Sequence, residues 1–273
     1  MRKQPVARFV TTLVIFCGSI RVVAEQVPVR YSEGLVHGFL VLKNQEGETL
    51  ADGELKQTVR GNQITTKTEF HFKDGSLNDE TTVVYQGKSF QLISDHLIQK
   101  GPSFPHQMDV GITKSNGQVT IHYTDDGKEK IINDRVTFPP DVANGMMLTL
   151  LKNIRPATSK TTVSMLATTP KPRLVKLVIT PSGEESFFIG NTKHTATHYV
   201  VRVDIGGVAG AVAPIVGKQP ADTHIWIVTD EAPAFVKMEG PLYNQGPVWR
   251  IELASPTWAP RGSKNDSGKT QGN

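Results

Sequence analysis

Residues 63–73 read QITTKTEFHFK, and this stretch decides the fold. Apolar or β-branched residues at the even positions from Ile64 to Phe72 alternate with polar residues at the odd positions. A period of two is typical of a β-strand that packs one face and exposes the other. Gly61-Asn62 and Asp74-Gly75 flank the stretch, and both dipeptides tolerate the positive φ of tight hairpin turns. The sequence therefore predicts a strand with a hairpin at each end.

The same pattern of alternating strands and turn residues continues in both directions along the chain. Short segments rich in β-branched and aromatic residues are separated by Asn, Asp and Gly, as in a series of antiparallel hairpins. This many hairpin-linked strands form a meander. The natural twist of such a long sheet curls it into an open or partial barrel. The predicted strands are 34–43, 50–60, 63–73, 80–86, 89–99, 107–114, 118–124 and 130–136, then 161–167, 173–180, 185–189, 195–204, 223–229, 234–238 and 248–253.

One segment departs from the strand pattern. Pro139 and Pro140 end a strand, Asp141 offers an N-cap oxygen, and apolar residues then recur at helical spacing as far as Ile154. Gly145 weakens this helix, because an interior glycine costs about 1 kcal/mol relative to alanine. The predicted fold class is all-β with minor helices: a long curved antiparallel meander forms an open or partial barrel, covered by one or two short helices.

The N-terminus has the order of a secretory signal. Arg2 and Lys3 precede the apolar run 9–20 (FVTTLVIFCGSI), and small residues lead to Ala24. The run is shorter than the roughly 20 residues of a membrane-spanning helix, although Arg21 close to the cut leaves an uncleaved anchor as an alternative. We expect 1–24 to be a cleaved signal peptide, 25–259 a single β domain, 260–273 a disordered tail, and the product to be periplasmic or secreted.

Removal of this segment changes two properties of the chain. Residues 1–24 hold four of the 30 Lys and Arg residues and none of the 26 Asp and Glu residues, so 26 of each remain. A neutral chain without a basic cluster argues against nucleic acid as a partner. Cys17, the only cysteine, leaves with the signal, which excludes disulfides and thiolate metal sites. A lipoprotein would keep a cysteine at the cut, but Phe16 before Cys17 is too bulky for that signal.

Sequence motifs of enzymes with known signatures are absent. His194 and His198 would chelate a metal from a helix, but their segment reads as a strand, where they stand about 13 Å apart. We therefore predict no metal and no cofactor. Three carboxylate–imidazole pairs could serve general-base chemistry but equally resemble strand ends. They are Asp95 with His96, His106 with Asp109, and Asp222 with His224.

Two further features are explained by ordinary turn formation and core packing. The acidic run from Asp74 to Glu80 lacks the ligand spacing of an EF-hand and reads as a turn. Trp226 could form an aromatic carbohydrate platform, but alternation turns it away from the flanking Ile225 and Ile227, and packing explains it better.

An uncharged stretch of small residues, 206–217 (GGVAGAVAPIVG), is too short to cross a bilayer and too apolar to stand in water. We expect it to cover the concave face of the sheet together with the helix, and to form the wall of any apolar-ligand site. The predicted wall residues are Met146, Met147, Leu150, Val212 and Ile215.

This layout resembles the LolA-like group of bacterial periplasmic lipoprotein carriers. The resemblance rests on the meander, the segment 141–154, the stretch 206–217, and the closing strands THIWIVTDEAPAFVKMEG and GPVWRIEL at 223–240 and 246–253. It implies an unclosed barrel whose concave side receives acyl chains, but it transfers no individual functional residue.

The leading hypothesis is an exported binding or envelope-maintenance protein, not an enzyme, that accepts a lipid or an acylated protein. One alternative is an exported hydrolase whose site assembles in space, with His96, His106 or His194 as base. The other is a purely structural module whose groove is its core.

Overall fold

A computed structural model describes residues 26–125, 127–168, 172–189, 192–204, 219–229 and 232–254. The predicted signal 1–24, the stretch 206–217 and the tail 260–273 lie outside these ranges, as do Val212 and Ile215.

The described chain forms one antiparallel sheet of 14 strands that curves without closing into a barrel. Strands β1 to β8 follow one another outward to one edge; the chain then crosses to the opposite edge, and β9 to β14 return until β14 pairs with β1. The first eight strands are β1 Val36–Lys43, β2 Thr49–Arg60, β3 Gln63–Phe72, β4 Leu77–Gln86, β5 Phe90–Lys100, β6 Met108–Thr113, β7 Gln118–Asp125 and β8 Lys128–Arg135. The remaining six are β9 Thr161–Ala167, β10 Arg173–Ile189, β11 Thr192–Asp204, β12 Thr223–Val228, β13 Ala234–Gly240 and β14 Trp249–Leu253.

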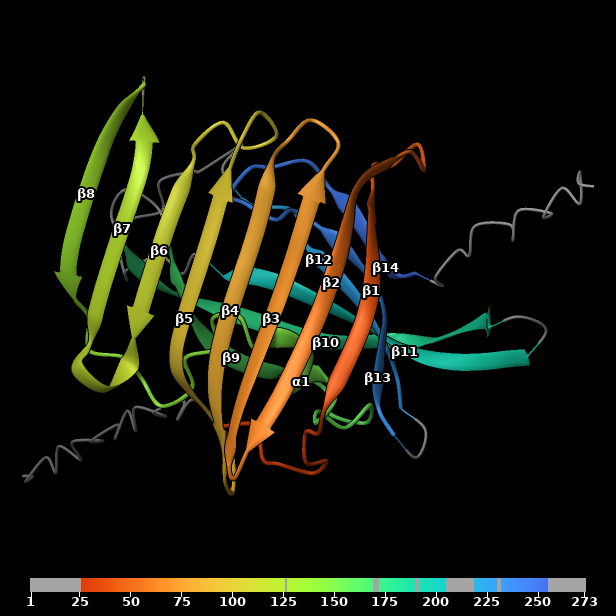
Figure 1. The fold of residues 1–273 in the computed structure, drawn as a ribbon. Coiled ribbons are helices and arrows are strands. Elements are labelled where there is room, and N and C mark those ends of the chain that lie inside the picture. The colour runs from red at the N-terminus through yellow and green to blue at the C-terminus, as the bar shows by residue number, and fades with distance from the viewer. Residues whose placement is uncertain are drawn as a thin grey trace, which may run out of the picture.

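The curvature folds the sheet over itself. Strands β1 to β8 form the front layer in Figure 1, and β9 to β14 run behind and across them, with the short helix α1 (Met147–Leu151) between the layers. The predicted fold class is therefore confirmed. None of the helices within the described ranges has the length and apolar character needed to cross a membrane.

Two predicted elements differ from the structure. The segments 173–180 and 185–189 form the single strand β10, because a shift of pairing register between Pro181 and Glu184 lets the strand continue through the break. The predicted helix 141–154 is wrong in extent, since only Met147–Leu151 is α-helical. Gly145 adopts a φ of 64°, which an α-helix cannot contain. The N-cap of the helix is therefore Met146 rather than Asp141.

The interior contains two apolar clusters. The first surrounds the chain that crosses between β8 and β9, and it joins inward side chains of both layers, such as Ile64, Ile121, Ile179 and Ile225. The second is smaller and rich in aromatic rings; it contains Leu40, Leu42, Ala51, Phe70, Phe72, Phe104, Trp249 and Ile251. The layers are thus held by burial of apolar surface from both halves of the sheet.

Candidate functional site

The concave face is partly filled by residues 136–160, which we call the crossing segment. The segment is fixed to the edge strand β9 through Asp141 and Ser164. The Ser164 hydroxyl donates to both carboxylate oxygens of Asp141 at 3.0 and 2.9 Å, and Lys176 Nζ donates to Oδ2 at 3.2 Å. The backbone amide of Ser164 donates to the carbonyl of Asp141 at 3.1 Å, and the amide of Ala143 donates to the carbonyl of Ser164 at 2.8 Å, which extends the edge of the sheet. Asp141 therefore anchors the segment and does not cap a helix.

Further polar groups hold the same segment. The side chain of Asn144 donates to the carbonyl of Leu166 and accepts from its amide. The Tyr199 hydroxyl donates to the carbonyl of Ile154 at 3.0 Å, and burial raises the pKa of Tyr199 to about 12. These anchors lie on β9 to β11, in the rear layer. A second set comes from the chain before β1, where the backbone amides of Arg30 and Tyr31 both donate to Asn153 Oδ1 at 2.8 Å.

The front layer contacts the segment at Gly145. An added Cβ there would lie 1.9 Å from Thr82 Oγ1 and 2.5 Å from Asp95 Oδ1. The Thr82 hydroxyl itself donates to Asp95 Oδ1 at 2.8 Å, and both residues are buried. Only glycine combines the positive φ with this approach, so the position is sterically matched to β4 and β5.

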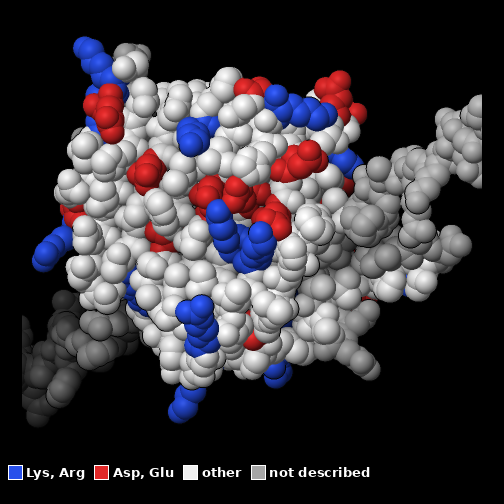
Figure 2. All heavy atoms as spheres, in the orientation of Figure 1, with Lys and Arg blue, Asp and Glu red and all other residues white. Residues whose placement is uncertain are grey.

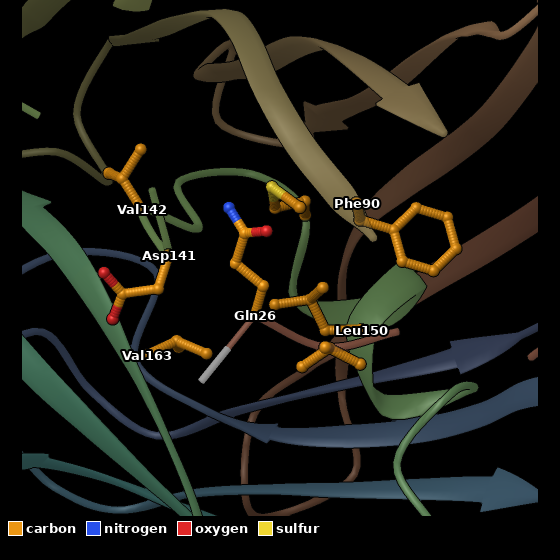
Figure 3. A pocket seen from close by; sticks show the side chains of 8 residues that line it. Gln26, Phe90, Asp141, Val142, Leu150 and Val163 are labelled. Atoms are coloured by element: carbon orange, nitrogen blue, oxygen red, sulfur yellow. The ribbon is translucent and has the colours of Figure 1, made fainter. Parts of the chain in front are cut away.

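Figure 3 shows a small cavity beside the crossing segment, lined by Gln26, Phe90, Asp141, Val142, Leu150 and Val163 among others. Its volume is about 10 Å³, close to the space that one water molecule occupies. The predicted wall residues Met146 and Leu150 also line it and are buried, whereas Met147 is half-buried. This part of the interior is filled by protein.

A different part of the concave face keeps accessible surface. Leu55, Thr68, Glu80 and Leu97 lie opposite one another on β2, β3, β4 and β5, and we call them the middle row. All four are only half-buried, although Leu97 packs against the first cluster and Leu55 against the second. The middle row therefore lies between the two apolar clusters and is not fully covered by either.

Two carboxyl groups occupy this region. Burial, followed by the charge of Asp95, raises the pKa of Glu80 to about 8. Burial also raises the pKa of Asp95 to about 6, against the hydrogen bond from Thr82 and the nearby His96. Glu80 keeps some contact with solvent. Within the described ranges, no hydrogen bond or ion pair reaches the Glu80 carboxyl.

A polar row runs parallel to the middle row, through Gln57, Thr66, Thr82 and Asp95. Thr66 donates to Gln57 Oε1, and Gln57 Nε2 donates to Glu33 Oε2 at 2.8 Å. The same Glu33 oxygen accepts from Lys152 Nζ of the crossing segment at 2.6 Å, in a largely buried ion pair. The one lysine of the crossing segment close to this row is thus already neutralised.

The candidate bases of a hydrolase do not meet. His96 projects from the outer face of β5 and pairs with Asp109 of β6 at 2.8 Å, rather than Asp109 with His106. His194 stands beside the Phe187 ring at 5.5 Å, and His106 lies in the loop after β5. Asp222 is engaged by Arg202 instead of His224. Each pair is a surface contact on a different element.

His194 and His198 both lie on β11, as predicted for a strand. His198 Nε2 approaches His224 Nδ1 at 2.9 Å, and the His198 ring stacks on Trp226 at 4.4 Å between centroids. Lys237 Nζ, on the neighbouring strand β13, lies over the Trp226 ring at 3.8 Å from its centroid. Both faces of Trp226 are thus occupied, which leaves no open carbohydrate platform. No cluster of three or more metal-binding side chains is present among the residues described.

The sequence pattern missed Glu80 as a site residue and gave Asp95 only as a partner of His96. Glu80 was assigned to an acidic turn, but it lies within β4, where Asp79 faces outward to Lys67 and Glu80 faces inward. The alternation itself was available as a signal: Asn78, Glu80, Thr82 and Val84 share a face. That face mixes polar and apolar residues, so sequence alone did not distinguish inside from outside.

Comparisons with known proteins give fold resemblance at low identity. No family model matches the chain, and no curated protein matches it. The β-barrel-like protein of a domain of unknown function, DUF1849, from Brucella abortus is 11% identical with a TM-score of 0.46, covering 82% of this chain and 98% of that one. The hypothetical lipoprotein YmcC from Escherichia coli (K12) is 9% identical with a TM-score of 0.35, covering 82% of this chain and 86% of that one.

Proposed function

We propose that this chain is an exported, LolA-like envelope protein that binds an apolar ligand, a lipid or the acyl chain of an acylated protein, on the concave face of its sheet. The observation that carries the proposal is the middle row, Leu55, Thr68, Glu80 and Leu97. These side chains keep accessible surface on the inner face, between two buried apolar clusters. A concave, mostly apolar surface with a few polar groups is the usual character of a small-molecule site.

The crossing segment sets the condition for binding. Ligand sites typically enclose about 300–1,000 Å³, whereas the cavity beside Met146 and Leu150 has about 10 Å³. A ligand therefore enters along the middle row, and the crossing segment shifts to admit it. Polar anchors hold the segment to β9 to β11 and to the chain before β1, whereas its approach to β4 and β5 at Gly145 is a steric contact, so that contact is the side that opens.

A hydrocarbon probe tests this site directly. We expect the mature protein to bind diphenylhexatriene, with a rise in its fluorescence on titration. Thr68→Trp fills the middle row and should weaken binding at least about tenfold, equivalent to about 1.4 kcal/mol. Thr65→Trp places the same ring on the outer face of the same strand and should leave binding unchanged. Ile215→Glu should also weaken binding if the stretch 206–217 forms a wall of the site.

A structural module is the second candidate, and the small volume of the cavity beside the crossing segment favours it. In that case the groove is simply core. Failure of the folded wild-type protein to bind the probe, together with an absence of lipid in protein purified from its native envelope, would reject the carrier in favour of the module.

A further inference from the structure

The inner face of β4 and β5 carries hydrogen-bond acceptors that lack a donor. Glu80 receives no hydrogen bond or ion pair from any residue in the described ranges, and of the two Asp95 oxygens only Oδ1 is engaged, by Thr82. The two carboxyls lie on adjacent strands in neighbouring register rows, since Thr82 pairs with Asp95 and Glu80 pairs with Leu97. Two acids in one apolar interior repel each other when both are charged.

A second acceptor nearby is independently unsatisfied. Gln99 follows Leu97 by two residues on the same face of β5 and is 1% exposed. Its Nε2 donates to Asn78 Oδ1 at 2.8 Å and to the carbonyl of Leu242 at 2.9 Å, whereas Oε1 has no partner in the described part of the chain. A buried acceptor without a donor is unfavourable, and this end of β5 also lacks a donor. Asp95 and Gln99 stand four residues apart on the strand, about 13 Å between Cα atoms, so the donor for Gln99 is separate from any group that reaches Glu80 and Asp95.

Three lysines on or near β2, β3 and the crossing segment do not supply a donor to these acids. Lys152 of the crossing segment is paired with Glu33 at 2.6 Å. Lys67 lies on the outer face of β3, where it pairs with Glu69 and Asp79, and Lys56 likewise pairs with Glu54 outside. His96 acts electrostatically on Asp95, but its ring projects from the outer face and pairs with Asp109 at 2.8 Å. Glu80 is therefore left without a counter-charge within the described ranges.

We propose, on the basis of the function proposed above, that the ligand is an amphiphile with a primary ammonium group, which lies between Glu80 and Asp95 while its apolar chain follows Leu55 and Leu97. The ammonium group has three donors and no acceptor, which matches a site made of acceptors. The half-buried leucines at the two ends of the middle row supply the apolar contacts.

An ammonium group fits this site better than the other common head groups. A hydrogen bond from a charged donor to a carboxylate is about twice as strong as a neutral one, so an alcohol gains less than an amine. A fatty acid would add a third carboxyl to a region where burial already raises the pKa of both Glu80 and Asp95. A cation reverses that effect, because an opposite charge stabilises the ionised acid.

Displacement of bound diphenylhexatriene compares the head groups on one chain length. Dodecylamine, dodecanol and dodecanoic acid are titrated below their micelle-forming concentrations against the wild-type protein at neutral pH. We expect dodecylamine to displace the probe at a concentration at least about tenfold lower than dodecanol, with dodecanoic acid weakest. Glu80→Gln should reduce the preference of amine over alcohol to less than about threefold, and Asp95→Asn should reduce it in the same direction.

Glu69→Gln is the matched control, since it removes the same charge from the outer face of the adjacent strand and should keep the preference. Circular dichroism verifies that each variant retains its β structure. Probe binding without a preference for the amine overturns this inference and leaves the apolar carrier in place. A preference that survives in both Glu80→Gln and Asp95→Asn also overturns it. No probe binding by the wild type rejects the proposed function itself.

Discussion

The outer and inner faces of strands β2 to β5 place the same residue types in opposite environments. On the outer face, acidic and basic side chains intermingle (Figure 2), and Lys67 bridges Glu69 and Asp79. The hydrogen bond from Lys67 is the main cause of the lowered pKa of Glu69, with a smaller contribution from His71 and against the effect of burial. One residue after Asp79, on the inner face, burial raises the pKa of Glu80.

The difference shows where the sheet tolerates charge. An exposed acid gains a cation at little desolvation cost, whereas the inward Glu80 loses water and finds no cation among the described residues around it. The outer face is a solvated surface of ordinary ion pairs. The inner face keeps unpaired acids at a site that a purely structural core would fill with apolar residues.

The largest expected effect tests the contact between the crossing segment and the inner face. Gly145→Ala should destabilise the protein by about 3 kcal/mol or more, because it combines positive-φ strain of about 1–2 kcal/mol with overpacking of about 1–3 kcal/mol. Gly61 has a similar φ of 58° but nothing within 4 Å of an added Cβ, compared with 1.9 Å to Thr82 at Gly145. Gly61→Ala should therefore cost only about 1 kcal/mol.

Urea unfolding of the two variants measures that difference. Equal losses at Gly145 and Gly61 would mean that the crossing segment does not seat against Thr82 and Asp95. The proposal that a ligand enters by opening the contact of Gly145 with β4 and β5 would then lose its support.

The next effect is the dependence of stability on pH. The folded-state pKa of Glu80 is raised to about 8 and that of Asp95 to about 6. Between the ordinary values, 4.5 for Glu80 and 3.8 for Asp95, and these raised values, the folded state binds more protons than the unfolded state, so stability falls as pH rises. We expect a lower unfolding temperature at pH 9 than at pH 6, and Glu80→Gln should remove at least half of that difference.

The outer face gives the opposite sign. The pKa of Glu69 is lowered, so its contribution is present above its ordinary pKa and is lost as pH falls through the lowered value. Glu69→Gln should therefore reduce the loss of stability in acid and leave the alkaline limb unchanged. Thermal unfolding followed by circular dichroism at each pH distinguishes the two variants. If Glu80→Gln leaves the alkaline limb intact, Glu80 is ionised and hydrated in the folded protein.

Most of the sheet could be predicted from the sequence, because alternation and Asn-Gly or Asp-Gly turns are local signals. The segments around 63–73 were recovered with their faces correct, and Ile64, Phe70 and Phe72 are buried as expected. Prediction failed where a local signal met a tertiary constraint. Helical spacing after Asp141 was overridden by Gly145, whose conformation is selected by its contact with β4 and β5.

The candidate site was the least predictable part. Met146 and Leu150 were expected inside and are buried there, because apolar residues in an amphipathic segment signal burial directly. Glu80 and Asp95 carry no such signal, since a carboxyl is normally expected to face water. Their inward position follows only from the register of β4 and β5 and from which layer lies behind them.

The smallest expected effect concerns Trp226, which lies on the outer face of the sheet but, unlike the charged residues there, is buried. Trp226 is only 7% exposed because His198 stacks on one face and Lys237 Nζ covers the other at 3.8 Å. Lys237→Met should cost about 1 kcal/mol, since a partly desolvated cation–π contact contributes about 0.5–2 kcal/mol and methionine retains some apolar cover. Lys67→Met is the matched control, because Lys67 makes exposed ion pairs that contribute about 0–1 kcal/mol and are screened by salt. Urea unfolding at low and high salt separates the two lysines: the loss in Lys67→Met should shrink with salt, whereas the loss in Lys237→Met should persist. A salt-sensitive loss at both positions would mean that Lys237 stabilises the sheet through Glu239 alone, at 3.2 Å, and that the cover over Trp226 contributes nothing measurable.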